Sequence, residues 1–268
     1  MPTAPPLEIP AMPARCRRES LLALVISLLP VLGVLSAWGA GRPGLAMLIF
    51  GVTFMIIAVG TVLPRCALFG PLVTKLPVEA AEAREVCLTI DDGPDPATTP
   101  VLLDLLDKHE ARAVFFLIGD RARKHPEWVA EIARRGHEIG NHSQTHPAGL
   151  FWLLRPWQLW REVAGCQETL RGLLGRAPVW FRPPVGHHNL FLAPILRALG
   201  LRMMIWNCRG FDGVEREIST ILHHIERGLR PGAIILLHEG RSVSPVVLSA
   251  TLEMVARKGF LIVLPKIS

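Results

Sequence analysis

Two long runs of uncharged, mostly apolar residues lie near the start of the chain. Residues 20–41 and 43–64 contain no charged side chain, and only Arg42 separates them. Each run has about the 20 residues that a helix needs to cross the hydrocarbon core of a bilayer. Pro30 and the glycines within the runs are tolerated in membrane helices. We therefore expect a helical hairpin at residues 19–64 that crosses the membrane twice.

A cleaved signal peptide is the alternative interpretation of the first run. Basic residues precede it, and small residues follow near 37–40, as in secretory signals. The length of the apolar core and the second run favour the hairpin. Because Arg15, Arg17 and Arg18 precede the first run and only Arg42 lies between the runs, the positive-inside rule places both ends of the hairpin in the cytoplasm. We expect an inner (plasma) membrane protein with a cytoplasmic α/β domain.

From residue 85 onward, short apolar runs alternate with amphipathic helical patterns. Strands are expected at residues 86–90, 113–118, 137–141, 179–182, 202–207, 233–238 and 260–264. Helices are expected at residues 99–109, 126–135, 156–174, 190–199, 214–229 and 245–258, and four of these patterns stop at Gly136, Gly175, Gly200 and Gly259, as helices often do. This alternation predicts parallel strands joined by crossovers, in either an open doubly wound sheet or a barrel-like one.

The patterns divide the 268 residues into four parts. They are a Pro-rich, disordered N-terminus (1–18), the transmembrane hairpin (19–64), a linker (65–84) and the α/β domain (85–268). The net charge of +6 comes partly from arginines beside the hairpin, where anionic membrane lipid would attract them. No basic run with interleaved aromatic residues indicates nucleic acid binding.

The cysteines do not form a recognisable metal or disulfide motif. Five are scattered along the chain, without a Cys-x-x-Cys pair: Cys16, Cys66, Cys87, Cys166 and Cys208. The odd number and the spacing argue against a disulfide framework or a zinc ribbon and agree with a reducing compartment.

Polar residues follow the predicted strands at their carboxyl ends, where parallel α/β folds place their functional sites. Asp91 and Asp92 end the first strand, within CLTIDDGPDP. His142 and His146 follow the third strand, four residues apart, which on a helical turn places both imidazoles on one side. Later strands end near three more polar residues, namely Arg182, Asp212 and His238.

Each of these pieces alone has an ordinary explanation. Paired acids also occur in phosphate-accepting receiver domains, histidine pairs are usually unrelated to metals, and a lone histidine after a strand is often structural. Their joint occurrence at successive strand ends predicts a single site. Two imidazoles and one carboxylate suit zinc or a similar divalent ion that keeps a position open for water. A second carboxylate can then act as general base and a histidine as general acid, which is the constellation of a hydrolytic amidase or esterase.

These motifs resemble those of the polysaccharide deacetylases with a NodB-homology domain (carbohydrate esterase family four). TIDDGP, NHSQTH, RPPVG, WNCRGFDG and LLHEG stand in the family's order within residues 85–265. The resemblance implies an α/β fold, a distorted (β/α)7 barrel preceded here by the two transmembrane helices. It also implies roles for seven residues: Asp91 as base, Asp92, His142 and His146 as metal ligands, Arg182 as the residue that orients Asp91, and Asp212 as the partner of the general acid His238.

The chain departs from the family pattern beside the expected substrate pocket. Gly213 stands where the family usually has Trp after the acid, and Val185 stands where it often has Tyr. The backbone N–H at the Val185 position is expected to face the oxyanion, with Pro183 and Trp206 on the substrate side. The next two residues, His187 and His188, are expected to be exposed loop residues rather than substrate contacts.

The segment GLFWLLRPWQLW, residues 149–160, contains three of the seven tryptophans. It fits either the start of a core helix or an interfacial patch, because Trp favours the boundary between membrane and water.

The resemblance implies a metal-dependent hydrolase that removes an N-acyl group, most simply acetyl, from an amino sugar. The expected cofactor is a divalent metal, Zn²⁺ with Co²⁺ or Ni²⁺ as alternatives. The hairpin favours a substrate linked to a membrane lipid. An O-deacetylase or a non-sugar amidase on the same scaffold remains the alternative, and a non-enzymatic membrane scaffold is disfavoured because none of the motif residues is lost.

Overall fold

The computed structural model describes residues 8–266. Its α-helices are α1 (Ala14–Gly39), α2 (Pro43–Val62), α3 (Val78–Glu82), α4 (Thr99–Lys108), α5 (Gly119–Lys124), α6 (Pro126–Arg134), α7 (Pro156–Leu174), α8 (Leu192–Ala198), α9 (Ile218–Gly228) and α10 (Ser244–Arg257). The strands are β1 (Glu85–Gly93), β2 (Ala113–Leu117), β3 (Glu138–Asn141), β4 (Trp180–Phe181), β5 (Arg202–Met203), β6 (Cys208–Arg209), β7 (Ile234–His238) and β8 (Leu261–Ile262). Three short 3-10 helices complete the elements, namely η1 (Ala67–Phe69), η2 (Phe151–Leu153) and η3 (Pro184–Gly186).

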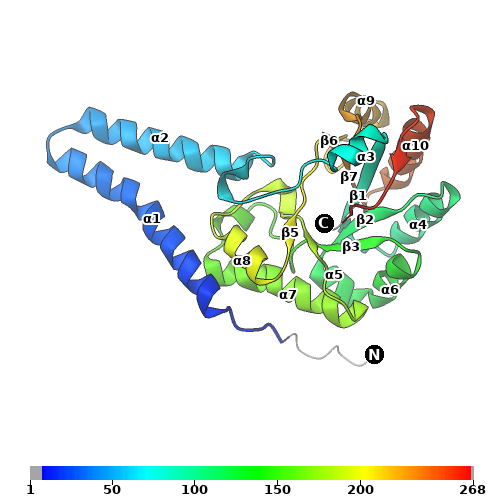
Figure 1. The fold of residues 1–268 in the computed structure, drawn as a ribbon, viewed down its shortest axis with the longest axis horizontal. Helices are drawn as coiled ribbons and strands as arrows, with labels where there is room; N and C mark the ends of the chain where they lie inside the picture. The colour runs from blue at the N-terminus through cyan, green and yellow to red at the C-terminus, as the bar shows by residue number, and fades with distance from the viewer. Residues whose placement is uncertain (1–7, 267–268) are drawn as a thin grey trace.

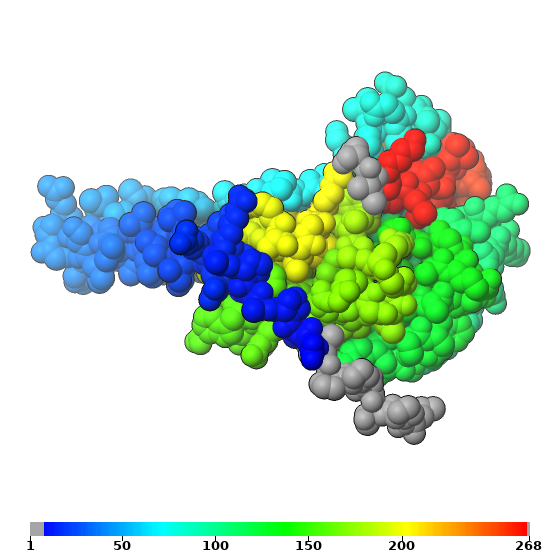
Figure 2. Space-filling model, turned by 60° about the horizontal axis from the view of Figure 1, so that its bottom comes forward, coloured from blue at the N-terminus to red at the C-terminus, as the bar shows by residue number. Residues whose placement is uncertain are grey.

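Helices α1 and α2 form a hairpin that projects from the rest of the molecule (Figures 1 and 2). Each is long and apolar enough to cross a membrane, and the first lies where a signal sequence would. Most of their large apolar side chains are exposed, which is costly in water because burial of apolar surface stabilises the folded state. Exposed apolar surface of this extent is what a bilayer would cover, so both helices are candidates for membrane spans.

The predicted disordered segment is too long. The prediction of disorder for residues 1–18 is wrong for residues 14–18, because α1 begins at Ala14. The preceding residues also contact the domain, where the indole Nε1 of Trp160 donates a hydrogen bond to the Pro10 carbonyl over 2.7 Å. Ile9 and Met12 pack against the same apolar cluster as Trp160. Residues 1–7 lie outside the described part of the chain.

The strands form one parallel sheet in the order β5-β4-β3-β2-β1-β7-β6, with β8 paired to the start of β1. The central strands β1 and β2 are almost wholly buried, as expected for a parallel sheet covered on both faces. On β1, Val86, Leu88 and Ile90 face the core shared with the surrounding helices. The alternating residues Thr89 and Asp91 therefore face the other side, the interior of the curved sheet.

The sheet is curled toward a barrel. Strands β5 and β6 lie at opposite ends of the strand order, yet only residues 204–207 separate them in the chain. The five steps from Met203 to Cys208 span at most about 18 Å, so the two edges must approach each other. Of the two arrangements left open by the sequence, the barrel-like one is confirmed.

The predicted strand at residues 202–207 is too long: β5 ends at Met203, and the next strand, β6, begins only at Cys208. After β5, Met204 pairs with Val73 of the linker, and the Ile205 N–H donates to the Val73 carbonyl over 2.8 Å. The linker thus takes the place of a sheet neighbour at the gap between the edges, and the chain rejoins the sheet as β6. The predicted helices agree within a few residues, and Gly136, Gly175, Gly200 and Gly259 all have positive φ at the predicted stops.

Candidate active site

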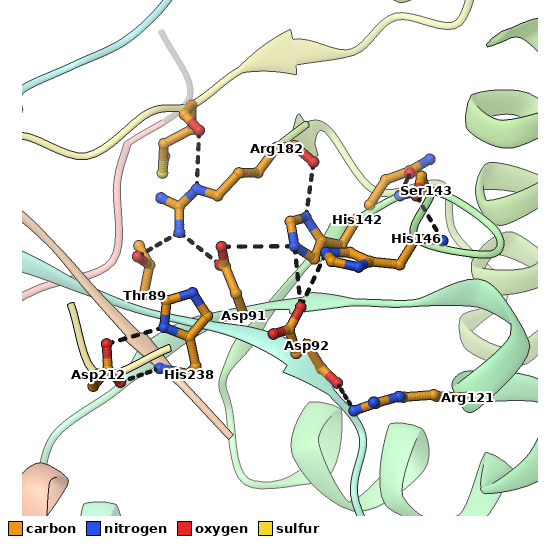
Figure 3. Close-up of polar contacts among 12 residues, drawn as sticks. Thr89, Asp91, Asp92, Arg121, His142, Ser143, His146, Arg182, Asp212 and His238 are labelled. Carbon is orange, nitrogen blue, oxygen red and sulfur yellow. Dashed lines mark hydrogen bonds and ion pairs between the residues drawn. The ribbon is translucent and has the colours of Figure 1, made fainter. Parts of the chain in front are cut away.

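The two adjacent aspartates at the end of β1 point to the same side because the strand is interrupted between them. Asp91 pairs with Phe116 of β2, but the next paired residue is Gly93, opposite Leu117. Asp92 is therefore the extra residue of a bulge, with φ of 73°. Successive residues of a regular strand point to opposite faces, and a bulge changes the direction of a side chain. Both carboxylates consequently face the His142 ring (Figure 3).

Asp92, His142 and His146 form a cluster that fits a metal ion. Their ligand atoms lie within 4.8 Å of one another, with Asp92 Oδ1 3.4 Å from His142 Nε2 and 3.2 Å from His146 Nε2. The histidines do not share a helical turn as expected; they lie in a loop after β3, in which Ser143 and His146 have positive φ. The predicted proximity of the two imidazoles holds nevertheless, with ring centroids 4.9 Å apart.

The contacts around this cluster leave its ligand atoms free. His142 Nδ1 lies 2.8 Å from the Arg182 carbonyl, so it donates its proton there and Nε2 keeps its lone pair, the arrangement common to metal-binding histidines. Asp92 Oδ1 is buried without a hydrogen-bond partner. Such an oxygen is costly to bury unless something coordinates it. The donor set is therefore suited to a divalent cation.

The protonation states also favour metal binding. Burial, followed by the charge of His142, lowers the pKa of His146 to about 4, so its imidazole is neutral near pH 7. Burial opposes ionisation of Asp92, but His142 and His146 hold the pKa of this carboxyl well below its usual range. One carboxylate and a neutral imidazole are the forms that bind zinc.

Asp91 is held by Arg182 on the side away from the histidines. Arg182 is fully buried, and its Nη1 lies 2.7 Å from Asp91 Oδ1. The guanidinium also lies over the Phe116 ring, 4.2 Å from its centroid. Asp91 Oδ2 remains 3.7 Å from His142 Nε2. The buried charge is thus paired, and the second oxygen of Asp91 is directed toward His142 (Figure 3).

His238 lies at the end of β7, next to Asp91 of β1. Asp212 accepts two hydrogen bonds from it, one from the backbone N–H over 2.7 Å and one from the ring Nδ1 over 3.0 Å. Burial lowers the pKa of His238, but the bond to Asp212 and its negative charge outweigh burial and raise this pKa to about 9. His238 is therefore protonated at neutral pH.

A cavity of about 260 Å³ opens beside these residues, lined by Asp92, Val185, Trp206, Arg209, Phe211, Gly213, Val214, Leu236 and His238. Val185 and Trp206 lie where the sequence predicts substrate contacts. Pro183 is buried and does not line this cavity. A Cβ at Gly213 would meet the His238 ring at 3.1–3.3 Å, so the absence of a side chain there leaves the approach to His238 open.

The sequence profile described as Polysaccharide deacetylase matches residues 79–204. A chitooligosaccharide deacetylase from Bradyrhizobium sp. is 34% identical over 167 residues, which cover 60% of this chain and 74% of that protein. The chain belongs to the polysaccharide deacetylase family. A peptidoglycan-N-acetylglucosamine deacetylase from Bacillus cereus is 29% identical over 189 residues, covering 65% of this chain and 83% of that one.

Solved structures of polysaccharide deacetylases share the fold. The peptidoglycan N-acetylglucosamine deacetylase Bc1960 superimposes with a TM-score of 0.66 and 31% identity, covering 72% of this chain and 89% of that one. A family 4 carbohydrate esterase from Streptomyces lividans, solved with acetate, gives a TM-score of 0.62 and 30% identity over 67% of this chain and 92% of its own. The predicted distorted (β/α)7 barrel is thereby confirmed.

Several residues around the site of this polysaccharide deacetylase have strained backbone conformations. Asp92, Ser143, His146, Val185 and Phe211 are non-glycine residues with positive φ, and all five lie in the segments that follow the strands around the site. Such conformations cost about 1–3 kcal/mol each and persist where the surrounding structure enforces them. The strain places ligand and pocket residues that regular strands would direct elsewhere.

The histidines after the RPPVG motif differ from the expectation. His188 is not exposed: its backbone N–H donates to the Thr61 carbonyl over 3.0 Å, and its Nε2 to the Pro64 carbonyl over 2.7 Å. His187 is partly buried. The pocket-lining loop is consequently tied to the end of α2, a link that the sequence pattern did not reveal.

The sequence offered two interpretations of residues 149–160, the start of a core helix and an interfacial patch. Phe151 and Trp160 are buried in an apolar cluster, whereas Trp152 and Trp157 remain 39% and 54% exposed. The segment is thus partly a core element and partly an exposed apolar surface.

Three further residues lie beside the site residues and were not singled out from the sequence. Thr89 Oγ1 accepts a hydrogen bond from Arg182 Nη1 over 2.7 Å, and Phe116 lies beneath the same guanidinium. Thr89 had a detectable signal, because it stands two residues before Asp91 and so shares its face of the strand. Glu239 is buried against the Thr99 hydroxyl, and burial raises its pKa to about 8.

Proposed function

We propose that this polysaccharide deacetylase removes an N-acetyl group from an amino sugar that is carried on a membrane lipid. The observation that carries the proposal is the shared pocket of the Asp92–His142–His146 cluster, the Asp91–Arg182 pair and the His238–Asp212 pair. Relatives named for chitooligosaccharide and peptidoglycan deacetylation support the amino-sugar class. The N-terminal hairpin, bonded to the pocket loop, supports the lipid linkage.

Asp92, His142 and His146 would hold the divalent metal, for which Zn²⁺ is the best match to two imidazoles and one carboxylate. When bound, such an ion supplies Lewis acidity, which lowers the pKa of water and polarises a carbonyl. Asp91 is proposed to accept the proton of the attacking water through Oδ2, while Arg182 holds Oδ1 at 2.7 Å. The backbone N–H of Val185 is proposed to donate to the carbonyl oxygen of the acetyl group.

His238 is proposed to donate a proton to the amine that leaves. The amide nitrogen of the substrate is a poor leaving group until it is protonated, so a positioned acid is required. The bond between His238 Nδ1 and Asp212 orients the ring and keeps Nε2 protonated. Base and acid come from adjacent strands, since Asp91 of β1 pairs with His238 of β7, and both side chains lie beside Asp92 (Figure 3).

The alternatives are less well supported. An O-deacetylase would have less need of a general acid with a raised pKa, because an alkoxide leaves more readily than an amide nitrogen. The non-enzymatic scaffold is disfavoured because the geometry brings the three ligands, the base and the acid together.

The hairpin supports an inner-membrane protein with its catalytic domain in the cytoplasm. Both ends of the hairpin lie at the catalytic domain, and the turn lies far from it (Figure 1). Arg15, Arg17, Arg18 and Arg65 flank the domain end, whereas Arg42 alone lies at the turn, which by the positive-inside rule favours a cytoplasmic domain end.

One experiment tests both the activity and this orientation. Membrane vesicles containing the full chain are supplied with a soluble N-acetylated chitooligosaccharide, and free acetate is measured. We expect acetate release from inverted vesicles, which expose the cytoplasmic face, and little from right-side-out vesicles. Release only from right-side-out vesicles would overturn the orientation. No release from either, with metal present, would count against the amino-sugar deacetylase.

The pH dependence of kcat is expected to depend on Asp212. His238 acts only while protonated, so the activity present near neutral pH is lost as the pH rises through about 9. In Asp212→Asn the negative charge that raises this pKa is absent while burial remains, so the alkaline fall should move to lower pH. A pH–rate profile checks the shift, and an unchanged alkaline limb would rule out His238 as the acid.

A further inference from the structure

An apolar groove of about 810 Å³ lies where the hairpin meets the catalytic domain. Its walls come from both hairpin helices, from residues 152–157 and from residues 189–191. Helices α1 and α2 diverge as they approach the domain (Figure 1), and the groove lies in this opening. The lining residues are mostly apolar, among them Leu24, Ile56, Phe69, Trp152, Trp157 and Phe191. Within the described part of the chain, Arg155 is the single charged residue that lines it.

The domain side of the groove is firmly built. The side-chain amide of Asn189 donates hydrogen bonds to the carbonyls of Phe151, Trp152 and Leu154 over 3.0–3.2 Å. These three bonds hold residues 151–154 against the 189–191 segment. The walls are thus fixed by buried polar contacts, which give a defined shape to an otherwise apolar surface.

The groove lies close to the catalytic cavity. Val185 lines that cavity and Asn189 lines the groove, and four residues of chain span at most about 14 Å. Between them, a Cβ at Gly186 would meet Trp206 at 2.6 Å and Pro64 at 3.0 Å, and His188 bonds the end of α2. The two sites are therefore near enough for one elongated molecule to reach both.

The surroundings indicate a hydrocarbon chain as the occupant. The groove continues into the exposed apolar surface of α1 and α2, the surface that a bilayer would cover. Leu153 and the two exposed tryptophans extend that surface onto the catalytic domain. A sugar polymer would need polar partners along its length, and this lining offers few.

Arg209 adds a positive charge in the catalytic cavity. Its guanidinium lies over Phe211, 4.0 Å from the ring centroid, and over Trp206 at 5.4 Å. No carboxylate pairs with it among residues 8–266. Burial and the charge of Arg65, which follows the end of α2, lower the pKa of Arg209. An anionic group on the substrate would relieve this unbalanced charge, and phosphate suits the planar guanidinium.

We propose that the substrate is an amino sugar joined through a phosphate to a lipid, with the hydrocarbon chain in the groove and the phosphate at Arg209. This inference rests on the proposed deacetylase activity and specifies its substrate class. It places the acetylated sugar at Asp91 and His238, the phosphate at the cavity wall, and the chain between the hairpin and residues 152–157.

The groove is tested by filling it. The purified full chain in detergent is assayed on N-acetylglucosaminyl phosphate esterified with either a long alkyl chain or a methyl group. Ser27→Trp places an indole in the groove, and Ser36→Trp puts the same side chain on exposed α1 surface near the turn. We expect Ser27→Trp to lower the long-chain to methyl ratio of kcat/KM about tenfold, equivalent to about two methylene groups losing apolar contact. Ser36→Trp should leave the ratio unchanged. Equal ratios in wild type and Ser27→Trp would overturn the groove assignment.

The phosphate is tested separately. Arg209→Gln should raise KM for the long-chain phosphate ester about tenfold or more, and should change KM little for a neutral long-chain glycoside of the same sugar. Arg216→Gln, an exposed residue on the following loop, is the charge-matched control. Equal effects of Arg209→Gln on the two substrates would overturn the phosphate assignment.

The outcomes separate this inference from the proposed function. If the methyl ester is deacetylated but neither variant changes substrate preference, the activity stands and the lipid-phosphate assignment fails. If no ester is deacetylated, crosslinking with a photoactivatable alkyl phosphate tests whether the groove binds a hydrocarbon chain. Crosslinking to residues 152–157 in wild type, reduced in Ser27→Trp, supports the groove while the deacetylase proposal fails. Absence of crosslinking overturns the groove as well.

Discussion

Asp91→Asn is expected to lower kcat about 10³-fold, within the range that general bases contribute, while metal content stays near that of the wild type. The amide oxygen of asparagine can still accept the hydrogen bond from Arg182 Nη1, which lies 2.7 Å from Asp91 Oδ1. The buried guanidinium therefore keeps a partner. The amide cannot take a proton from water, so the chemical step is lost and the metal cluster of Asp92, His142 and His146 is retained.

The measurements for this variant are acetate release, metal content by mass spectrometry and a thermal melt. Asp104→Asn is the matched control, since Asp104 lies on the exposed face of α4. A normal melt with lost activity supports Asp91 as the base. Retention of more than about a tenth of wild-type activity would show that another group accepts the proton, since a base contributes about 10²-fold at least.

His142→Ala should release the metal. Loss of a hydrogen-bond partner behind a ligand typically weakens metal binding about 10- to 100-fold, so loss of the ligand itself should exceed about 100-fold. Activity should fall in parallel and recover in part when excess metal is added. Isothermal titration of the metal-free protein with Zn²⁺ measures the affinity directly.

His223→Ala is the control for this substitution, because His223 is exposed on α9, away from the cluster. It should bind Zn²⁺ as the wild type does. If His142→Ala bound Zn²⁺ with unchanged affinity, the metal would lie elsewhere, and the assignment of Asp92 and His146 as ligands would fall with it.

Much of the site could be predicted because its residues stand at ends of strands that the apolar pattern makes visible. In β1 the run from Val86 to Ile90 is buried and ends at Asp91, and parallel strands collect their carboxyl ends at one edge. The metal cluster and the pairs Asp91–Arg182 and Asp212–His238 follow from that topology and from the family resemblance.

Other features depend on contacts between distant parts of the chain, which a local pattern does not encode. The bulge at Asp92 depends on the register with β2. The end of β5 at Met203 depends on Val73, which pairs with Met204 at the gap in the sheet. His188 looks like a polar loop residue in sequence, and only its bonds to the end of α2 explain its burial.

The hairpin was recognised from its apolar runs, but its relation to the site was not. The length and apolar composition of a run identify a helix that could cross a membrane, but they do not show where that helix packs against the rest of the chain. The groove between Trp152, Trp157 and the helices exists only once the chain is folded. Substrate class was therefore less predictable than reaction class.

The left-handed backbone of Asp92 has a consequence for how such a site can be lost in evolution. Asparagine adopts this conformation more readily than most residues, and a single nucleotide change separates its codons from those of aspartate. A lineage released from selection for hydrolysis can thus replace Asp92 and keep the bulge and the barrel. Cation binding would weaken while the folded domain and its cavity survive, so the loss of hydrolysis would not require the loss of the fold.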